Sequence, residues 1–112
     1  MLQFDLKFKE LPVTIAGANY RLVEMSGTVR DAYLGELAGR MRIGPDGKPA
    51  GFKTFSGVQA ALVSACLRDA AGHSVAAETI QGWPGTVVAA LYKAASELNG
   101  LAEDEKSAPK ND

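Results

Sequence analysis

Apolar and polar residues alternate strictly from Leu2 to Lys9, with leucine or phenylalanine at every even position. Because successive side chains of a strand point to opposite faces, this pattern predicts a half-buried β-strand. Two further apolar segments, Val13–Ile15 and Tyr20–Val23, flank the turn-prone sequence Ala-Gly-Ala-Asn and predict a hairpin. Pro12 lacks an amide hydrogen and therefore belongs at a strand start or edge. We expect a three-stranded antiparallel meander.

A helix with apolar residues at every fourth position is predicted after the meander. Ser26 can accept an amide hydrogen bond at the helix start, and the stripe that follows comprises Val29, Tyr33, Leu37 and Met41. Gly35 and Gly39 each cost up to ~1 kcal/mol relative to alanine inside a helix, so they either permit close packing or weaken the helix. Residues 44–51 contain two prolines and three glycines and predict an exposed, mobile loop.

Two more long helices are predicted in the second half of the chain. Ser56 and Gln59 have the spacing of a capping box, and the helix from there to about Asp69 is apolar on nearly every side, as expected of a central core helix. After a turn at Gly72-His73, residues 77–81 fit one helical turn. Pro84 suits the start of a final helix that ends at Asn99-Gly100 and whose core-facing stripe comprises Val87, Val88, Leu91, Ala94, Ala95 and Leu98.

The predicted fold is therefore α+β: a small N-terminal antiparallel β-meander packed on a bundle of about three helices. A chain of 112 residues is long enough for one core, and we assign residues 1–101 to a single domain. Residues 102–112 contain no large apolar side chain that would offset the entropy of ordering, so we expect a disordered acidic and polar tail.

Composition removes several classes of function. Twelve basic and thirteen acidic residues are interspersed, whereas a nucleic-acid-binding protein needs a basic stripe. The single cysteine, Cys66, forms no internal disulfide and fits a reducing cytosol. No signal-peptide pattern begins the sequence, and the longest weakly polar stretch, Val58–Leu67, is shorter than the about 20 residues that span a bilayer. We expect a soluble intracellular protein.

No candidate for catalysis or metal binding carries the residues its chemistry needs. His73 is the only histidine, and Cys66 falls on the most apolar predicted helix, without a base to activate it. The carboxylates of residues 103–105 lie in the predicted tail, which holds no fixed geometry. Residues 44–48 lack the spacing of a phosphate-binding loop. We expect no enzyme activity, cofactor or metal, which leaves a protein-binding module by elimination.

The order of motifs resembles the tail assembly chaperones of long-tailed bacteriophages over most of the chain. The residues that carry the resemblance are Val13–Ile15 with Tyr20–Val23, Glu24–Gly27 leading into Arg30–Leu34, Leu67–Asp69 with Gly72, and Glu97–Leu101. The resemblance implies a non-catalytic protein of the host bacterial cytoplasm, encoded by a phage or prophage. It implies binding to the tape-measure protein, recruitment of tail-tube subunits, absence from the mature virion and, in many members, a frameshifted longer form.

The final helix is the predicted partner-binding surface, because aromatic side chains with a polar tip are common at binding hot spots. The predicted contact residues are Trp83, Val88, Leu91, Tyr92 and Leu98. Aromatic residues of so small a domain are more often core or rim, and a homo-oligomer is also compatible with the sequence. Two other interpretations stay open at this stage: a structural virion component such as a tail-terminator or connector subunit, and a small-molecule enzyme or sensor.

Overall fold

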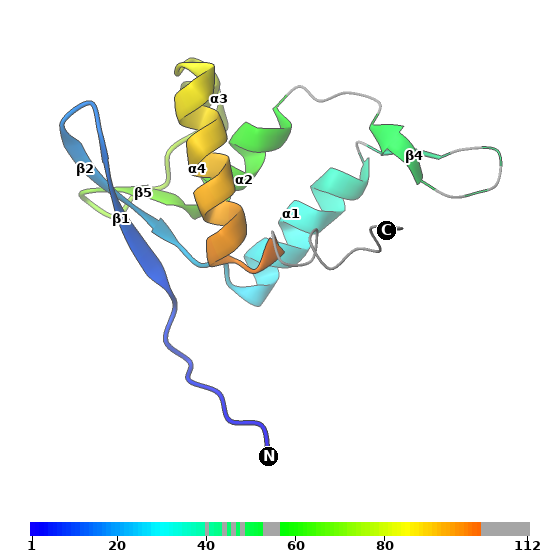
Figure 1. Cartoon of the computed structure of the whole chain (residues 1–112), viewed down its shortest axis with the longest axis horizontal. Helices are drawn as coiled ribbons and strands as arrows, with labels where there is room; N and C mark the ends of the chain where they lie inside the picture. The colour runs from blue at the N-terminus through cyan, green and yellow to red at the C-terminus, as the bar shows by residue number, and fades with distance from the viewer. Residues whose placement is uncertain (40, 44, 46, 48, 53–56, 102–112) are drawn as a thin grey trace, which may run out of the picture.

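A computed structural model describes residues 1–39, 41–43, 45, 47, 49–52 and 57–101 of the chain. Within them the elements follow one another as β1 (Glu10–Ile15), β2 (Ala18–Val23), α1 (Gly27–Gly39), β3 (Met41–Ile43), β4 (Pro49–Phe52), α2 (Val58–Cys66), β5 (Leu67–Asp69), α3 (Ala77–Gln81) and α4 (Gly85–Leu98). The α+β fold predicted from the sequence is confirmed, with helices packed on a small antiparallel sheet (Figure 1). The predicted tail, residues 102–112, lies outside the described residues.

The main sheet has the strand order β1-β2-β5, and both pairings are antiparallel. β1 and β2 form the predicted hairpin, with Ile15 opposite Ala18 and only two residues in the turn. Both turn residues have positive φ, 52° at Ala16 and 79° at Gly17. Positive φ at both positions gives the turn a twist that matches the twist of the flanking strands.

The third strand of the sheet is β5, and the prediction of a strand from Leu2 to Lys9 is wrong. Residues 1–9 have no regular secondary structure and are exposed. β2 ends at Val23, so the sheet offers no neighbour for a strand that precedes Lys9. The apolar residues of this segment are even-numbered, whereas Val13 and Ile15, which pack on the core, are odd-numbered. A continuous strand would turn the two sets to opposite faces.

Helix α1 begins as predicted, with the Ser26 hydroxyl accepting the Val29 amide hydrogen at 3.2 Å. Tyr33 is its buried residue, and Val29 and Leu37 are half-buried against the core. No heavy atom lies within 4 Å of a Cβ built at Gly35, so this glycine does not serve close packing. The helix ends at Gly39, and Met41 begins the small hairpin of β3 and β4 instead of extending the helical stripe.

The β3–β4 hairpin replaces part of the predicted loop. Pro49–Phe52 forms β4, which pairs with β3 through Met41 and Phe52, so residues 49–51 are a strand and not a loop. Residues 44, 46 and 48 of that predicted loop lie outside the described residues. The hairpin lies at the far side of the molecule from the β1–β2 hairpin (Figure 1).

The central core helix is present but shorter than predicted. α2 ends at Cys66 because Leu67 takes an extended conformation and pairs with Leu22 on the open edge of β2. Leu67 keeps its side chain fully buried while its backbone joins the sheet. Ser56 of the predicted capping box lies outside the described residues, and Gly57, with φ 76°, precedes the helix without a side-chain cap.

The last two helices follow the sequence closely. α3 is the expected single turn, and α4 runs from Gly85 to Leu98 after Pro84. Gly100 has φ 75°, the left-handed conformation expected at a helix end. The core lies between the sheet and helices α2, α3 and α4; its fully buried large side chains are Leu22, Leu62, Val63, Cys66, Leu67 and Ile80.

Candidate partner-binding cleft

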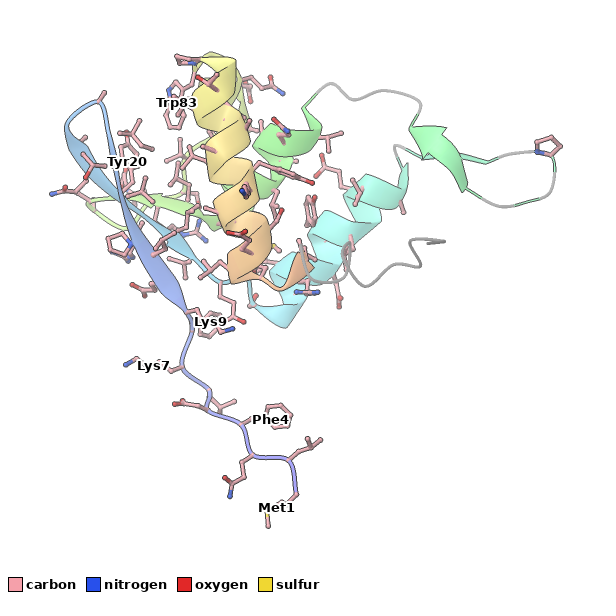
Figure 2. The ribbon with its side chains drawn as sticks, viewed as in Figure 1. Met1, Phe4, Lys7, Lys9, Tyr20 and Trp83 are labelled. Atoms are coloured by element: carbon pink, nitrogen blue, oxygen red, sulfur yellow. The ribbon has the colours of Figure 1, made fainter. Side chains whose placement is uncertain are left out.

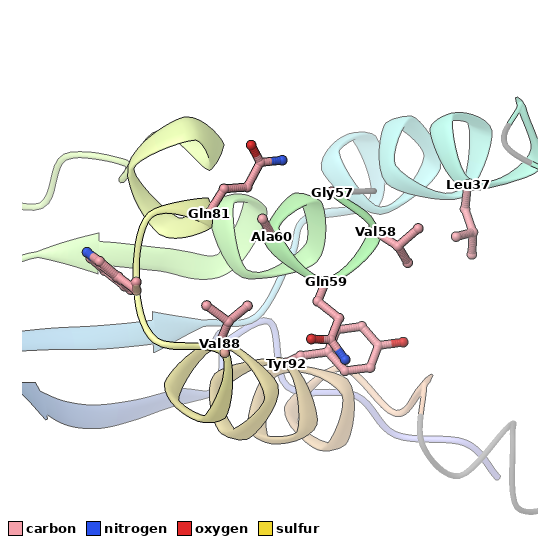
Figure 3. Close-up of a pocket in the computed structure, with 10 residues that line it drawn as sticks. Leu37, Gly57, Val58, Gln59, Ala60, Gln81, Val88 and Tyr92 are labelled. Carbon is pink, nitrogen blue, oxygen red and sulfur yellow. The ribbon is translucent and has the colours of Figure 1, made fainter. Parts of the chain in front are cut away.

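An apolar cleft of about 610 Å³ opens between α2 and α4 and reaches the C-terminal part of α1. The side chains of Val58 and Gln59 from α2 and of Val88 and Tyr92 from α4 line its walls, and Leu37 closes one end (Figure 3). The other described residues that line it are Gly57, Ala60, Gln81, Trp83 and Gly85.

None of the ten lining residues is charged, and only Gln59, Gln81, Trp83 and Tyr92 bring polar side-chain atoms. Such a lining can cover an apolar side chain of a partner and orient it with a few hydrogen bonds. The cleft therefore offers a largely apolar surface with a few hydrogen-bonding groups.

Three of the five predicted contact residues line this cleft: Trp83, Val88 and Tyr92. Val88 is 9% exposed and contributes mainly to the core, whereas Trp83 and Tyr92 are half-buried. Leu91 is buried in the core. Leu98 is half-buried against the core and lies outside the cleft lining.

Trp83 is held in place by an aromatic neighbour. Its ring meets the ring of Tyr20 edge to face, with the centroids 6.2 Å apart and the planes at 77° (Figure 2). This geometry is favourable because the positive edge of one ring faces the negative face of the other. The contact fixes the junction of α3 and α4 on strand β2, and Trp83 thus has a structural role beside its place in the cleft.

Asn99 fixes the other end of α4 with a set of hydrogen bonds. Its buried side chain accepts the Met25 amide hydrogen at 2.8 Å and donates to the carbonyl oxygen of Ala95 at 2.8 Å and to Cys66 Sγ at 3.3 Å. The Arg30 guanidinium donates to the Asn99 carbonyl oxygen at 2.7 Å. These contacts join α4 to α2 and to the β2–α1 connection.

Two of the remaining candidates for chemistry, Cys66 and His73, lie within the described residues, whereas residues 103–105 lie outside them. Cys66 is fully buried, and burial raises the pKa of its thiol, while the hydrogen bond from Asn99 and the charge of Arg68 lower that pKa in part. His73 is an exposed turn residue, as predicted. Over the described part of the chain, no group of three or more His, Cys, Asp or Glu side chains could hold a metal ion.

Periodicity could not identify Leu37, Val58 and Gln59 as cleft residues. Each belongs to a stripe or cap that the sequence assigns to helix formation, and the cleft arises only where α1, α2 and α4 meet. Helical spacing gives the face on which a residue lies but not the gap left between two helices. No helix among the described residues is long and apolar enough to cross a membrane.

Comparison with known proteins adds one structural relative. No protein-family model matches the chain, and no curated protein shows a significant match. A solved structure titled "Structure of bacteriophage HK97 tail assembly chaperone" superposes with a TM-score of 0.54 at 20% identity, covering 81% of this chain and 85% of that one. At this identity the match concerns the fold, and we conclude that the chain has a fold like that of the HK97 tail assembly chaperone.

Proposed function

We propose that this protein is a phage tail assembly chaperone, which binds a tape-measure protein and helps to recruit tail-tube subunits without catalysing a reaction. The observation that carries the proposal is the fold similarity over 81% of the chain. The motif resemblance noted in the sequence points in the same direction. On this proposal the protein acts in the host bacterial cytoplasm and is absent from the finished particle.

The α2–α4 cleft is the surface that we assign to the tape-measure protein. A long helical protein that awaits assembly exposes apolar stripes, and an apolar groove on a folded domain can cover one of them. The cleft of this chain has the required character, because its lining is uncharged and formed largely by apolar side chains. The half-buried Leu37, Val58 and Tyr92 supply contact area in the cleft, and Leu37 and Tyr92 also pack against the core.

A substitution pair on helix α1 tests the role of the cleft. Leu37→Glu places a carboxylate in the cleft, whereas Leu34→Glu changes a leucine of the same helix that is 40% exposed and outside the lining. Each variant is co-expressed with the tape-measure protein of the same genome, and the affinity of the complex is measured. We expect Leu37→Glu to weaken binding by about tenfold or more, equivalent to about 1.4 kcal/mol, and Leu34→Glu to bind as the parent chain does.

Two results would contradict the proposal. If the folded parent chain does not bind its own tape-measure protein, the chaperone function is wrong; if both glutamate variants bind normally, only the assignment of the cleft is wrong. Mass spectrometry of purified particles separates a chaperone from the alternative, a tail-terminator or connector subunit. A chaperone is absent from particles, whereas a subunit is present in fixed copy number.

A further inference from the structure

The N-terminal arm, residues 1–9, exposes apolar side chains that nothing in the described chain covers. Leu2, Phe4 and Leu6 are 82%, 83% and 92% exposed, and Phe8 is 49% exposed. The arm runs away from the body of the protein below β1 (Figure 2). Because alternate side chains of a strand share a face, these four residues would form one apolar face if the arm joined a sheet as a strand.

The base of the arm is fixed, so that the arm cannot fold back on its own sheet. The Lys9 amide donates to Glu24 Oε1 at 3.0 Å, and the Glu24 amide donates to the Lys9 carbonyl oxygen at 2.8 Å. Lys9 thus continues the β1–β2 ladder. To lie beside β1, the arm would have to reverse between Phe8 and Glu10, where the chain has no glycine, proline, asparagine or aspartate for a tight turn.

Strand β1 offers the edge that such an arm could join. β1 is the outer strand of the sheet, and its pairing with β2 uses the odd-numbered residues, as the Lys9–Glu24 bond shows. The backbone groups of Glu10, Pro12 and Thr14 therefore point outward. The opposite edge, β5, is covered, because the Asp69 amide donates to the His73 carbonyl oxygen and the Val75 amide donates to the Leu67 carbonyl oxygen.

A shallow groove lies beside this edge, between β1 and α4. Its volume is about 370 Å³, and it is lined by Val13, Thr14, Ile15, Ala16, Thr86, Val87, Ala90 and Leu91. Most of these side chains are apolar and none is charged. An added strand whose apolar side chains face the same way as Val13 and Ile15 would extend the covered face of the sheet over this groove.

We propose that the arm of a second copy of this chain pairs antiparallel with β1 and places Leu2, Phe4 and Leu6 over the β1–α4 groove. One register satisfies both strands: Phe4 opposite Val13, Leu6 opposite Leu11 and Lys7 opposite Glu10. Opposed residues share a face of the sheet, so the apolar side chains of the arm meet those of β1 and the lysine meets the glutamate. Pro12 has no amide hydrogen, so the carbonyl oxygen of Asp5 opposite it keeps its hydrogen bond with water.

The register explains why the apolar residues change parity between the arm and β1. Within one strand, even-numbered Phe8 and odd-numbered Leu11 fall on opposite faces. In antiparallel pairing between copies, Leu2, Phe4 and Leu6 of the arm meet Ile15, Val13 and Leu11 of β1, while Phe8 lies opposite Lys9. The apolar positions are even-numbered in the arm and odd-numbered in β1. This switch is unfavourable for one continuous strand with a single apolar face, but it suits antiparallel pairing between two chains.

Cysteine cross-linking tests the register directly. Leu6→Cys protein is mixed with Leu11→Cys protein, oxidised mildly and analysed by mass spectrometry for the 6–11 disulfide between chains. Buried Cys66 is present in every sample. A matched control mixes Lys7→Cys with Leu11→Cys, because Lys7 is opposite Glu10 and its side chain is on the other face. We expect about tenfold more cross-link from the 6–11 pair than from the 7–11 pair.

The association state provides the second measurement. Sedimentation of the parent chain over a range of concentrations is expected to show dimers or larger assemblies, and Leu6→Asp is expected to sediment as a folded monomer with an unchanged far-UV spectrum. A parent chain that stays monomeric throughout, or 6–11 and 7–11 pairs that cross-link equally, would overturn the proposal. Both measurements use this chain alone, so their outcome is independent of tape-measure binding.

Discussion

The N-terminal arm and helix α4 are both amphipathic segments, yet only one of them is covered. In α4 the apolar positions recur with helical spacing, and Val88, Leu91 and Ala95 are at most 9% exposed. In the arm the apolar positions recur every second residue, and all four are at least 49% exposed. The two patterns are equally regular. They differ in whether the rest of the chain provides a surface opposite the apolar face.

Periodicity therefore predicts the local geometry of a segment but not the surface that covers it. Helix α4 packs on α2 and β2, and the contacts of Asn99 hold its C-terminal end in place. The arm has no strand of the same chain beside it, since β2 ends at Val23. An exposed apolar edge of this kind indicates an interaction with another chain.

The largest expected effect compares the same substitution in the two segments. Leu91→Ala removes a side chain that is 6% exposed and leaves a cavity in the core, so we expect the free energy of unfolding to fall by about 3 kcal/mol. Leu6→Ala changes a side chain that is 92% exposed, and we expect it to alter the free energy of unfolding by less than about 0.5 kcal/mol. Urea denaturation of the monomer at low concentration measures both. A loss of similar size in Leu6→Ala would mean that the arm docks on its own domain.

The next effect concerns the hydrogen bonds that close α4. Asn99→Ala leaves the buried Met25 amide without its acceptor and removes the bonds to Ala95 and Cys66. Because an unsatisfied buried polar group costs about 1–3 kcal/mol, we expect a loss of about 2 kcal/mol in unfolding free energy. Glu97→Ala, an exposed change two residues away, is the control and should alter stability by less than about 0.5 kcal/mol. Equal stability of the two variants would show that Asn99 does not fix the helix end.

The sequence predicted the elements whose signals are local. The hairpin turn, the Ser26 cap, the single turn of α3 and the end of α4 at Gly100 each depend on a few adjacent residues. Strand β5 was missed because Leu67 continues the apolar pattern of α2 and no helix-breaking residue follows before Gly72, and only the open edge of β2 makes the extended conformation favourable. The same cause, a neighbour distant in sequence, explains why a strand was wrongly predicted for Leu2–Lys9.

The candidate cleft was predicted only in part, for a related reason. The sequence identified Trp83, Val88 and Tyr92 on one wall but also included Leu91, which is buried in the core, because one helical stripe contains both kinds of residue. The opposite wall, with Val58 and Gln59, depends on how α2 lies against α4. The position of a residue on a helix face does not show whether the neighbouring helix fills the space beside it or leaves a gap.

A smaller effect is expected at the β1–β2 turn. Ala16 has φ 52°, a conformation that is strained for an alanine, whereas asparagine adopts it more readily. Ala16→Asn creates the Asn-Gly pair that two-residue hairpins prefer and should raise the unfolding free energy by about 1 kcal/mol. Ala18→Asn, on β2 next to the turn, is the control and should bring no gain. If thermal unfolding shows the same stability for Ala16→Asn and Ala18→Asn, the result argues against strain at Ala16.

The smallest effect uses Cys66 to measure how tightly the α4 side of the core is closed. Burial raises the pKa of this thiol above its ordinary value of 9.0, whereas the thiol of the unfolded chain titrates near that value. At about pH 7, well below 9.0, both states keep the proton, and stability does not depend on this group. As the pH rises further, the unfolded chain loses a proton that the folded chain retains, so the unfolding free energy falls.

By about pH 9 the parent chain should have lost up to about 0.4 kcal/mol that a Cys66→Ala variant retains, in addition to any constant difference between the two chains. Denaturant unfolding of both proteins at pH 7 and pH 9 gives this difference. Subtracting one protein from the other removes the contribution of other titrating groups, which is common to both. A Leu6→Cys thiol on the exposed arm is the matched control: it should react at once with a thiol reagent, whereas Cys66 should react only through opening of the core. Equal reaction rates would show that α4 covers its apolar face no better than the arm does.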